Sequence, residues 1–270
     1  MGPVPGGPVR ALRVWARWRM AELRIGRRRA AVVAALEDQL GRPCRLRPAG
    51  AVGQDSVYTV GDESGDFACL RLVNPYLTRG RVSADMPFRV LSGPERIERE
   101  WHAYSEGAAH GLTPRPLWRA EDALACAFVP GERLARRISE HPERFWDSLE
   151  AATAALARLH GLGLTHMDAS LANLIATPAG ELVFVDFEYG PADGLSPEQQ
   201  RALDHLRLVE TSLALQPGDP GDRWPAWLER LDRCTDEATR ACELAPLEPA
   251  LRATLAHDVL GPALRARFGR

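Results

Sequence analysis

Four polar residues lie close together between two apolar segments, in the stretch "THMDASLANLIATPAGELVFVDFE". They are His166, Asp168, Asn173 and Asp186. Transfer of a phosphoryl group requires a carboxylate that orients and deprotonates the acceptor hydroxyl, together with hard oxygen ligands for Mg²⁺. Asp168 has the chemistry for the first role. Asn173 and Asp186 supply amide and carboxylate oxygens for the second, so the spacing predicts a phosphotransfer site.

Each of these residues also has a purely structural interpretation. Asp168 alone would be a turn residue, Asn173 a cap and Asp186 a solvated carboxylate at a strand end, but their combination favours a site. His166 is interpreted as a loop histidine that bonds backbone carbonyl groups, and it receives no catalytic role. His160 is likewise assigned to the structure.

The elements that must position this loop are a helix over residues 142–163 and a strand over residues 181–187. Helical spacing of apolar residues predicts further helices at 94–111, 196–215, 224–244 and 247–267. Short alternating segments between Gly-containing turns predict strands at 44–50, 56–61, 67–73, 114–120 and 123–129. Strands followed by helices indicate an α+β chain with two lobes.

The segment "LARLHGLGLTHMDASLANLI", followed by "LVFVDFE", resembles the catalytic and metal-binding loops of the protein-kinase-like superfamily. It is most similar to the bacterial aminoglycoside phosphotransferases and lipopolysaccharide-core sugar kinases, and "DHLRLVETSL" is similar to a segment of the latter. The resemblance covers residues 44–215 and implies an N-lobe at 44–130 and a helical C-lobe at 131–270. It also implies that Asp204 braces the catalytic loop through backbone hydrogen bonds.

The resemblance assigns the nucleotide phosphates to a basic residue on the third strand, paired with a glutamate on the next helix. Arg71 in "ACLRL" stands where the family has lysine, and arginine's planar fork is not equivalent to an ammonium group. An exposed strand arginine is the alternative. Glu100 is preferred over Glu98 as the partner, because the number of residues between Glu100 and "TPRPL" is the one usual in kinase-like proteins, whereas Glu98 lies two residues too far away.

Two weaker elements complete the expected nucleotide site. Gly50 and Gly53 in "RPAGAVGQDSVY" loosely resemble the Gly-rich turn that covers the phosphates, although two glycines at this spacing also suit a plain hairpin. Backbone groups at Ala127 to Val129 are expected to bond adenine, on their position alone.

These features predict an ATP- and Mg²⁺-dependent phosphotransferase acting on a hydroxyl of a saccharide, a lipid-linked saccharide or another small molecule. The alternative is a catalytically silent nucleotide-binding or scaffold protein, motivated by Arg71 and the weak Gly-rich turn. A protein kinase is less favoured because no Ala-Pro-Glu signature follows Asp186.

Composition restricts the class of protein. The 270 residues are 45% hydrophobic and 26% charged, which suits a globular protein with a large core. The five cysteines are scattered, so neither a disulfide framework nor a zinc site is indicated. No apolar run is long enough to span a bilayer, and we expect a cytoplasmic protein without a specific nucleic-acid partner.

The N-terminal segment, residues 1–43, has a different character. Residues 1–47 hold eleven arginines against three acidic residues, and the chain has no lysine. Residues 9–40 are predicted to form a basic amphipathic helix, with Gly26 as a weak interruption and with Gly41 and Pro43 as its end. Either the helix packs Trp15 or Trp18 on the N-lobe, or it docks on an anionic membrane surface at the inner face. Residues 190–250 carry twelve acids and six arginines, which would suit a cationic acceptor instead.

Overall fold

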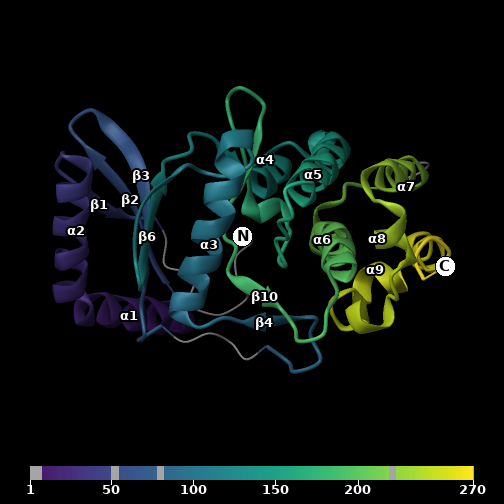
Figure 1. Cartoon of the computed structure of the whole chain (residues 1–270), viewed down its shortest axis with the longest axis horizontal. Helices are drawn as coiled ribbons and strands as arrows, with labels where there is room; N and C mark the ends of the chain where they lie inside the picture. The colour runs from purple at the N-terminus through teal and green to yellow at the C-terminus, as the bar shows by residue number, and fades with distance from the viewer. Residues whose placement is uncertain (1–7, 50–54, 78–81, 219–222, 270) are drawn as a thin grey trace. The chain divides into compact units, whose positions relative to one another are not determined.

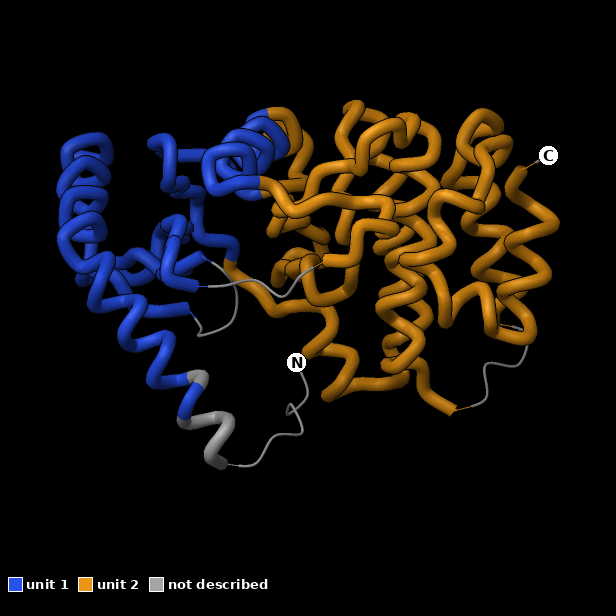
Figure 2. Tube along the Cα trace, turned by 90° about the horizontal axis from the view of Figure 1, so that it is seen from below, with its two compact units in different colours: residues 1–81, 92–105, 114–129 blue, residues 82–91, 106–113, 130–270 orange. Residues whose placement is uncertain are grey.

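The chain forms two compact units. The computed structural model describes residues 8–49, 55–77, 82–218 and 223–269. Figure 1 shows the helices and strands, and Figure 2 shows the two units in different colours. Unit 1 comprises residues 1–81, 92–105 and 114–129, and unit 2 comprises residues 82–91, 106–113 and 130–270. An antiparallel sheet and a largely helical part are both present, so the α+β class is confirmed.

Unit 1 is built on a five-stranded antiparallel sheet with the order β1-β2-β3-β6-β5. Its strands are β1 (Arg45–Pro48), β2 (Asp55–Asp62), β3 (Gly65–Val73), β5 (Pro116–Ala120) and β6 (Ala123–Ala127). All five predicted strands are therefore confirmed. Because side chains alternate along a strand, Leu70 and Leu72 of β3 are buried on one face of the sheet and Arg71 points to the other.

The helical segment predicted over residues 9–40, with Gly26 as a weak interruption, consists of two helices, α1 (Pro8–Arg24) and α2 (Gly26–Leu40). The chain turns at Ile25, directly before a glycine, a residue with low helix propensity. As predicted, α2 ends at Gly41, which adopts the left-handed conformation with φ 64°. The turn allows α2 to pack Val32 and Leu36 on the face of the sheet that buries Leu70.

The opposite face of the sheet is covered by α3 (Gly93–Gly107), whose first thirteen residues belong to unit 1. A capping box starts this helix: the Glu95 carboxylate accepts from the Ser92 N–H at 2.8 Å, and the Glu95 N–H donates to Ser92 Oγ at 3.4 Å. Figure 1 shows the sheet between α2 and α3. Unit 1 thus has three layers, and α3 faces the side of β3 that carries Arg71.

Unit 2 contains two small antiparallel sheets and seven α-helices within the described residues. One sheet pairs β4 (Phe88–Val90) with β10 (Tyr189–Pro191), and the other has the order β7-β8-β9. The strands of the latter are β7 (Glu132–Arg133), β8 (Leu174–Ala176) and β9 (Leu182–Phe184). The helices are α4 (Leu134–Glu140), α5 (Phe145–His160), α6 (Pro197–Ser212), α7 (Arg223–Cys234), α8 (Glu237–Ala241), α9 (Arg252–Ala256) and α10 (Leu260–Arg265).

Two of the predicted C-terminal helices are divided. The one predicted at 224–244 is interrupted before α8, because the Asp236 carboxylate accepts from the Thr239 N–H at 2.6 Å and starts a new helix. The one predicted at 247–267 consists of a 3₁₀ segment, α9 and α10. Pro249 and Pro262 lack the N–H that a continuous helix needs, which accounts for the separate pieces.

The core of unit 2 forms where α5 packs against α6 and α7. Trp224 and Trp227 of α7 are fully buried, and the Trp227 indole donates to Thr153 Oγ1 of α5 at 3.0 Å. A capping box at Ser196 and Gln199 starts α6, so the position at which this central helix begins is well defined. Among the described helices, none combines the length and the apolar content needed to cross a membrane.

Candidate functional site

A hairpin in unit 2 brings Asn173 and Asp186 next to each other. Strands β8 and β9 are antiparallel, with Leu174 opposite Phe184. The residue before β8 therefore lies beside the residues after β9, and the Val185 N–H donates to the Asn173 carbonyl at 3.0 Å. This local pairing places an amide and a carboxylate at the same end of the hairpin.

The loop that carries Asp168 is held by one face of α6. Gln200, Asp204 and Arg207 are separated by four and three positions, so they lie along the same side of that helix. Gln200 accepts from the Thr165 hydroxyl at 3.0 Å, and an Nη of Arg207 lies 3.6 Å from a carboxylate oxygen of Asp168. Successive positions of the helix thus contact successive positions of the loop.

Asp204 is the central anchor of this contact. Its fully buried carboxylate accepts from the backbone N–H groups of His166 and Met167, both at 2.7 Å, and bonds His160 Nε2 at 3.1 Å. Burial raises the pKa of Asp204, but the hydrogen bond and charge of His160, with those of His166, outweigh it and lower the pKa overall. The expectation that Asp204 braces the loop through backbone hydrogen bonds is confirmed.

His166 has the structural role expected from the sequence. Its side chain is fully buried, and Nε2 bonds the Val185 carbonyl at 3.0 Å. Its ring packs against Phe187 with a centroid separation of 4.5 Å and lies 5.8 Å from Phe184. His166 therefore joins the loop to the segment after β9.

Two residues of the site adopt left-handed backbone conformations that side chains other than glycine rarely take. Met167 has φ 67° and Asp186 has φ 76°. Such conformations cost on the order of 1–3 kcal/mol each and persist only where the surrounding structure enforces them. Met167 directly precedes Asp168, and Asp186 is itself a candidate metal ligand.

Asp168 lies in an environment suited to a general base. Its side chain is 24% exposed, and the Asn173 amide donates to its carbonyl at 3.1 Å and to its carboxylate at 3.4 Å. Burial raises the pKa of Asp168, and the nearby charge of Asp186 adds to this effect against the opposing charges of His166 and Arg207. The net increase brings this carboxylate closer to the range in which a base accepts protons effectively.

The donor set at the hairpin fits a magnesium ion. The Asn173 amide nitrogen is engaged by Asp168, and its amide oxygen accepts no hydrogen bond from any residue that the structure describes. With the carboxylate of Asp186, this oxygen forms a hard-oxygen pair of the kind Mg²⁺ accepts, since the ion retains several waters. Within the described ranges, no three His, Cys, Asp or Glu side chains group as a metal site.

Unit 1 contains a second, buried group of charged residues around Arg71. Arg71 Nε lies 2.9 Å from the Glu100 carboxylate, and an Nη lies 3.2 Å from Asp55. Arg96 also pairs with Asp55, at 2.6 Å, and the Tyr104 hydroxyl donates to Glu100. Two arginines and two carboxylates thus pair with one another in the interior of the unit.

The expected pair between Arg71 and Glu100 is therefore present. Glu98, the alternative, is 67% exposed and pairs with Arg119 instead. The Arg71 side chain is only 13% exposed, which excludes its interpretation as an exposed strand arginine. Its fork contacts one carboxylate from strand β2 and one from helix α3, a geometry that a single ammonium group does not reproduce.

We expect Arg71→Lys to destabilise the protein by about 1–3 kcal/mol, because a single ammonium group cannot keep both contacts of the guanidinium group with the buried carboxylates of Glu100 and Asp55. Thermal unfolding measures this loss. Arg119→Lys is the matched control, since its pair with the exposed Glu98 contributes little and its exchange should change stability by less than about 0.5 kcal/mol. An Arg71→Lys protein that is more stable than the wild type would mean that the site is built for lysine.

The structure places only some of the remaining residues that the sequence predicts for a nucleotide site. Gly50 and Gly53 lie outside the described residues. At the end of β6, the Ala127 N–H donates to the Arg115 carbonyl at 2.7 Å and the Phe128 N–H donates to Phe67 at 2.9 Å. Both N–H groups are thus occupied, and a backbone contact to adenine would use the carbonyl groups or the N–H of Val129.

The structure brings the predicted residues together in two groups. Asp168, Asn173 and Asp186 meet in unit 2, and Arg71 meets Glu100 in unit 1. Sequence reasoning missed Asp55 and Arg96, whose pairing joins positions 41 apart. It also missed the roles of Gln200 and Arg207, which their spacing of four and three on either side of Asp204 could have indicated.

Comparison of the sequence with models of known protein families and with curated proteins found no match. The functional interpretation therefore relies on the geometry of the two groups.

Proposed function

We propose that the protein is an ATP- and Mg²⁺-dependent phosphotransferase of the protein-kinase-like superfamily, acting on a hydroxyl of a saccharide or other small molecule. One observation carries the proposal: Asp168, Asn173 and Asp186 lie close together. The loop that bears Asp168 is held by the buried Asp204 through two backbone hydrogen bonds. Each of these groups has the chemistry that phosphoryl transfer needs.

In the proposed reaction, Asp168 orients the acceptor hydroxyl and accepts its proton as the oxygen attacks the terminal phosphate. Its raised pKa supports this role, because a stronger base takes the proton more readily. Arg207 and Asn173 limit the directions in which the carboxylate can turn. Asn173 and Asp186 would hold the Mg²⁺ ion, which when bound offsets the negative charge of the nucleotide phosphates.

Unit 1 contributes the proposed phosphate contact through Arg71. Glu100 and Asp55 orient the guanidinium group from two sides, so that its position is set before a ligand arrives. A preorganised cation loses little conformational freedom when it binds phosphate. This supports the assignment of Arg71 as the basic residue of the third strand that contacts the nucleotide phosphates.

A second candidate function is nucleotide binding without turnover. One observation favours it: the guanidinium group of Arg71 is already bound by two carboxylates, which reduces the net positive charge offered to phosphate. This alternative shares the nucleotide with the first proposal and differs in the absence of catalysis.

Thermal unfolding with Mg·ATP tests both functions at once. A ligand present at 100 times its Kd stabilises the folded state by about 2.7 kcal/mol. For a protein of this size, each kcal/mol raises Tm by roughly 2–4 °C, so an increase of several degrees is expected. Asp186→Asn should remove most of the increase that depends on Mg²⁺.

The matched control is Asp193→Asn, the same exchange at an exposed carboxylate of the same segment, and it should retain the wild-type increase. Wild-type protein whose Tm is unchanged by millimolar Mg·ATP would reject both functions.

A further inference from the structure

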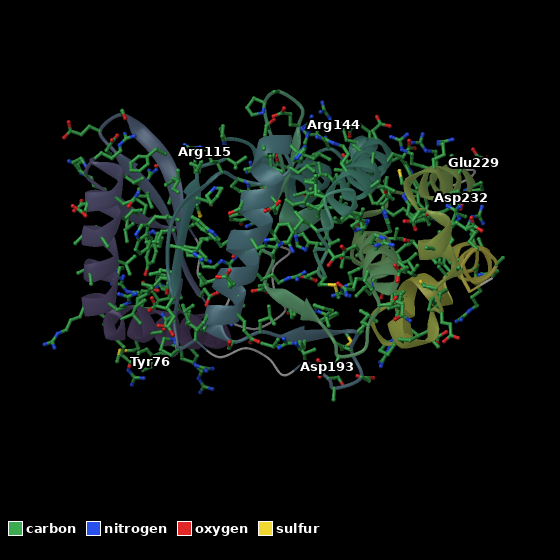
Figure 3. The ribbon with its side chains drawn as sticks, viewed as in Figure 1. Tyr76, Arg115, Arg144, Asp193, Glu229 and Asp232 are labelled. Carbon is green, nitrogen blue, oxygen red and sulfur yellow. The ribbon has the colours of Figure 1, made fainter. Side chains whose placement is uncertain are left out.

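The exposed large apolar side chains of unit 1 are concentrated on and beside α1. Trp15 and Met20 are each 53% exposed and Leu23 is 71% exposed. Tyr76, 48% exposed, lies at the same place, since the Arg24 guanidinium is 5.1 Å from the centre of its ring. Figure 3 shows Tyr76 at the outer margin of the unit. Folding within the unit leaves these four side chains, which we call the α1 patch, uncovered.

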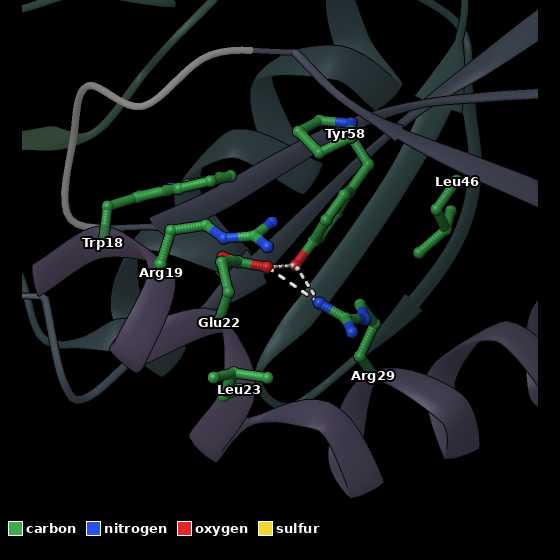
Figure 4. Close-up of a pocket in the computed structure, with 8 residues that line it drawn as sticks. Trp18, Arg19, Glu22, Leu23, Arg29, Leu46 and Tyr58 are labelled. Carbon is green, nitrogen blue, oxygen red and sulfur yellow. Dashed lines mark hydrogen bonds and ion pairs between the residues drawn. The ribbon is translucent and has the colours of Figure 1, made fainter. Parts of the chain in front are cut away.

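The other face of α1 is fixed to the sheet. Ala21 and Glu22 are buried, and the Glu22 carboxylate accepts from the hydroxyl groups of Ser56 and Tyr58 on β2. Arg29 of α2 pairs with the same carboxylate at 2.9 Å (Figure 4). Because Glu22 ties α1 to both β2 and α2, the helix cannot rotate to bury the α1 patch without breaking this network.

Arginines surround the α1 patch. Arg13, Arg19 and Arg24 of α1 are exposed, and the Arg19 guanidinium lies 5.6 Å from the centre of the Trp15 ring. The only acidic residue of α1 is Glu22, whose charge is used inside the unit. The outward face of the helix is therefore apolar and cationic, and α1 itself contributes no acidic residue to that face.

We propose that the α1 patch docks on the surface of an anionic lipid bilayer, with α1 lying in the plane of the interface. Tryptophan and tyrosine favour the boundary between lipid headgroups and acyl chains, and the flanking arginines match the negative charge of the headgroups. A short helix with an apolar face and a strongly cationic border is the typical interfacial type. The proposal goes beyond the phosphotransferase function and does not depend on it.

Sedimentation with lipid vesicles tests the proposal on the full chain. Wild-type protein should bind phosphatidylcholine vesicles that contain phosphatidylglycerol, should not bind pure phosphatidylcholine vesicles, and should dissociate as salt increases. Each arginine near an anionic surface strengthens binding about five-fold, so a triple variant with Arg13→Gln, Arg19→Gln and Arg24→Gln should bind about 100-fold more weakly.

A second triple variant removes the apolar contact: Trp15→Ser, Met20→Ser and Leu23→Ser should also abolish sedimentation. These side chains are exposed, so unfolding is not expected, and an unchanged Tm verifies this. The control carries Val259→Ser, Arg252→Gln and Arg265→Gln in unit 2, which replace one exposed apolar side chain and two exposed arginines, and it should bind like the wild type.

Three results would overturn the proposal. The first is equal sedimentation of the wild type and both α1 variants. The second is binding that does not depend on phosphatidylglycerol. The third is a dimer, in size-exclusion chromatography, that the α1 substitutions dissociate, because the patch would then be covered by a second copy of the chain.

Discussion

Asp168→Asn should lower the rate of Mg·ATP hydrolysis by about 10²–10⁴-fold while leaving the affinity for Mg·ATP nearly unchanged. The exchange keeps the size of the side chain and its contact with Asn173, but it removes the group that accepts the proton. Hydrolysis by water is the appropriate readout, because it needs no knowledge of the acceptor. Affinity is measured separately, from the increase in Tm with Mg·ATP.

The pH dependence of the same rate tests the role of Asp168 independently. Its folded-state pKa is raised, so the active carboxylate form is lost as pH falls through a value above the ordinary 3.8 of an aspartate. Arg207→Met removes a charge that opposes this increase, and it should move the acid limb to still higher pH. Asp193→Asn is again the control and should leave the profile unchanged.

Equal hydrolysis by the wild type and Asp168→Asn, with nucleotide binding retained and no acceptor found among a pool of saccharides, would reject the enzyme. The nucleotide-binding protein without turnover would then be the remaining proposal.

Asp204→Ala should destabilise the protein by at least about 3 kcal/mol, since it leaves two buried N–H groups and a buried histidine without their acceptor. At roughly 2–4 °C for each kcal/mol, Tm should decrease by about 10 °C. The rate of Mg·ATP hydrolysis should also decrease, even at temperatures well below the new Tm, because His166 and Met167 no longer hold Asp168 in position. Asp204→Asn retains one acceptor oxygen and should have an intermediate effect.

Glu210→Ala is the matched control for this prediction. Glu210 lies on the same helix and also accepts from two backbone N–H groups, those of Ala253 at 3.0 Å and Thr254 at 2.7 Å. It caps α9, away from the loop, so its loss should reduce stability without changing hydrolysis below Tm. If the two variants reduce hydrolysis equally, Asp204 acts only through global stability.

The sequence alone determined the local parts of this protein. Alternation of side chains predicted all five strands of the unit 1 sheet. The sequence also predicted the strand before Asp186 and the loop that carries Asp168 and Asn173, but it did not predict β8. The hairpin that brings Asn173 and Asp186 together was therefore seen only in the structure. Asp204 was also identified, although only through the resemblance to a known family. Its two backbone partners became visible in the structure.

The tertiary structure decided what depends on residues far apart in the chain. Arg71 gained a second partner, Asp55, because β2 and β3 are neighbours, and Asp55 gained Arg96 because α3 lies on the same face of the sheet. At Gly26 the sequence indicated only a weak interruption of the helix. The tertiary structure turned it into a full break, because α1 and α2 bury different side chains and one straight helix would not reach both places. The periodicity of apolar residues indicates which face of a helix or strand is apolar. Which other element packs on that face depends on the order in which strands and helices pack.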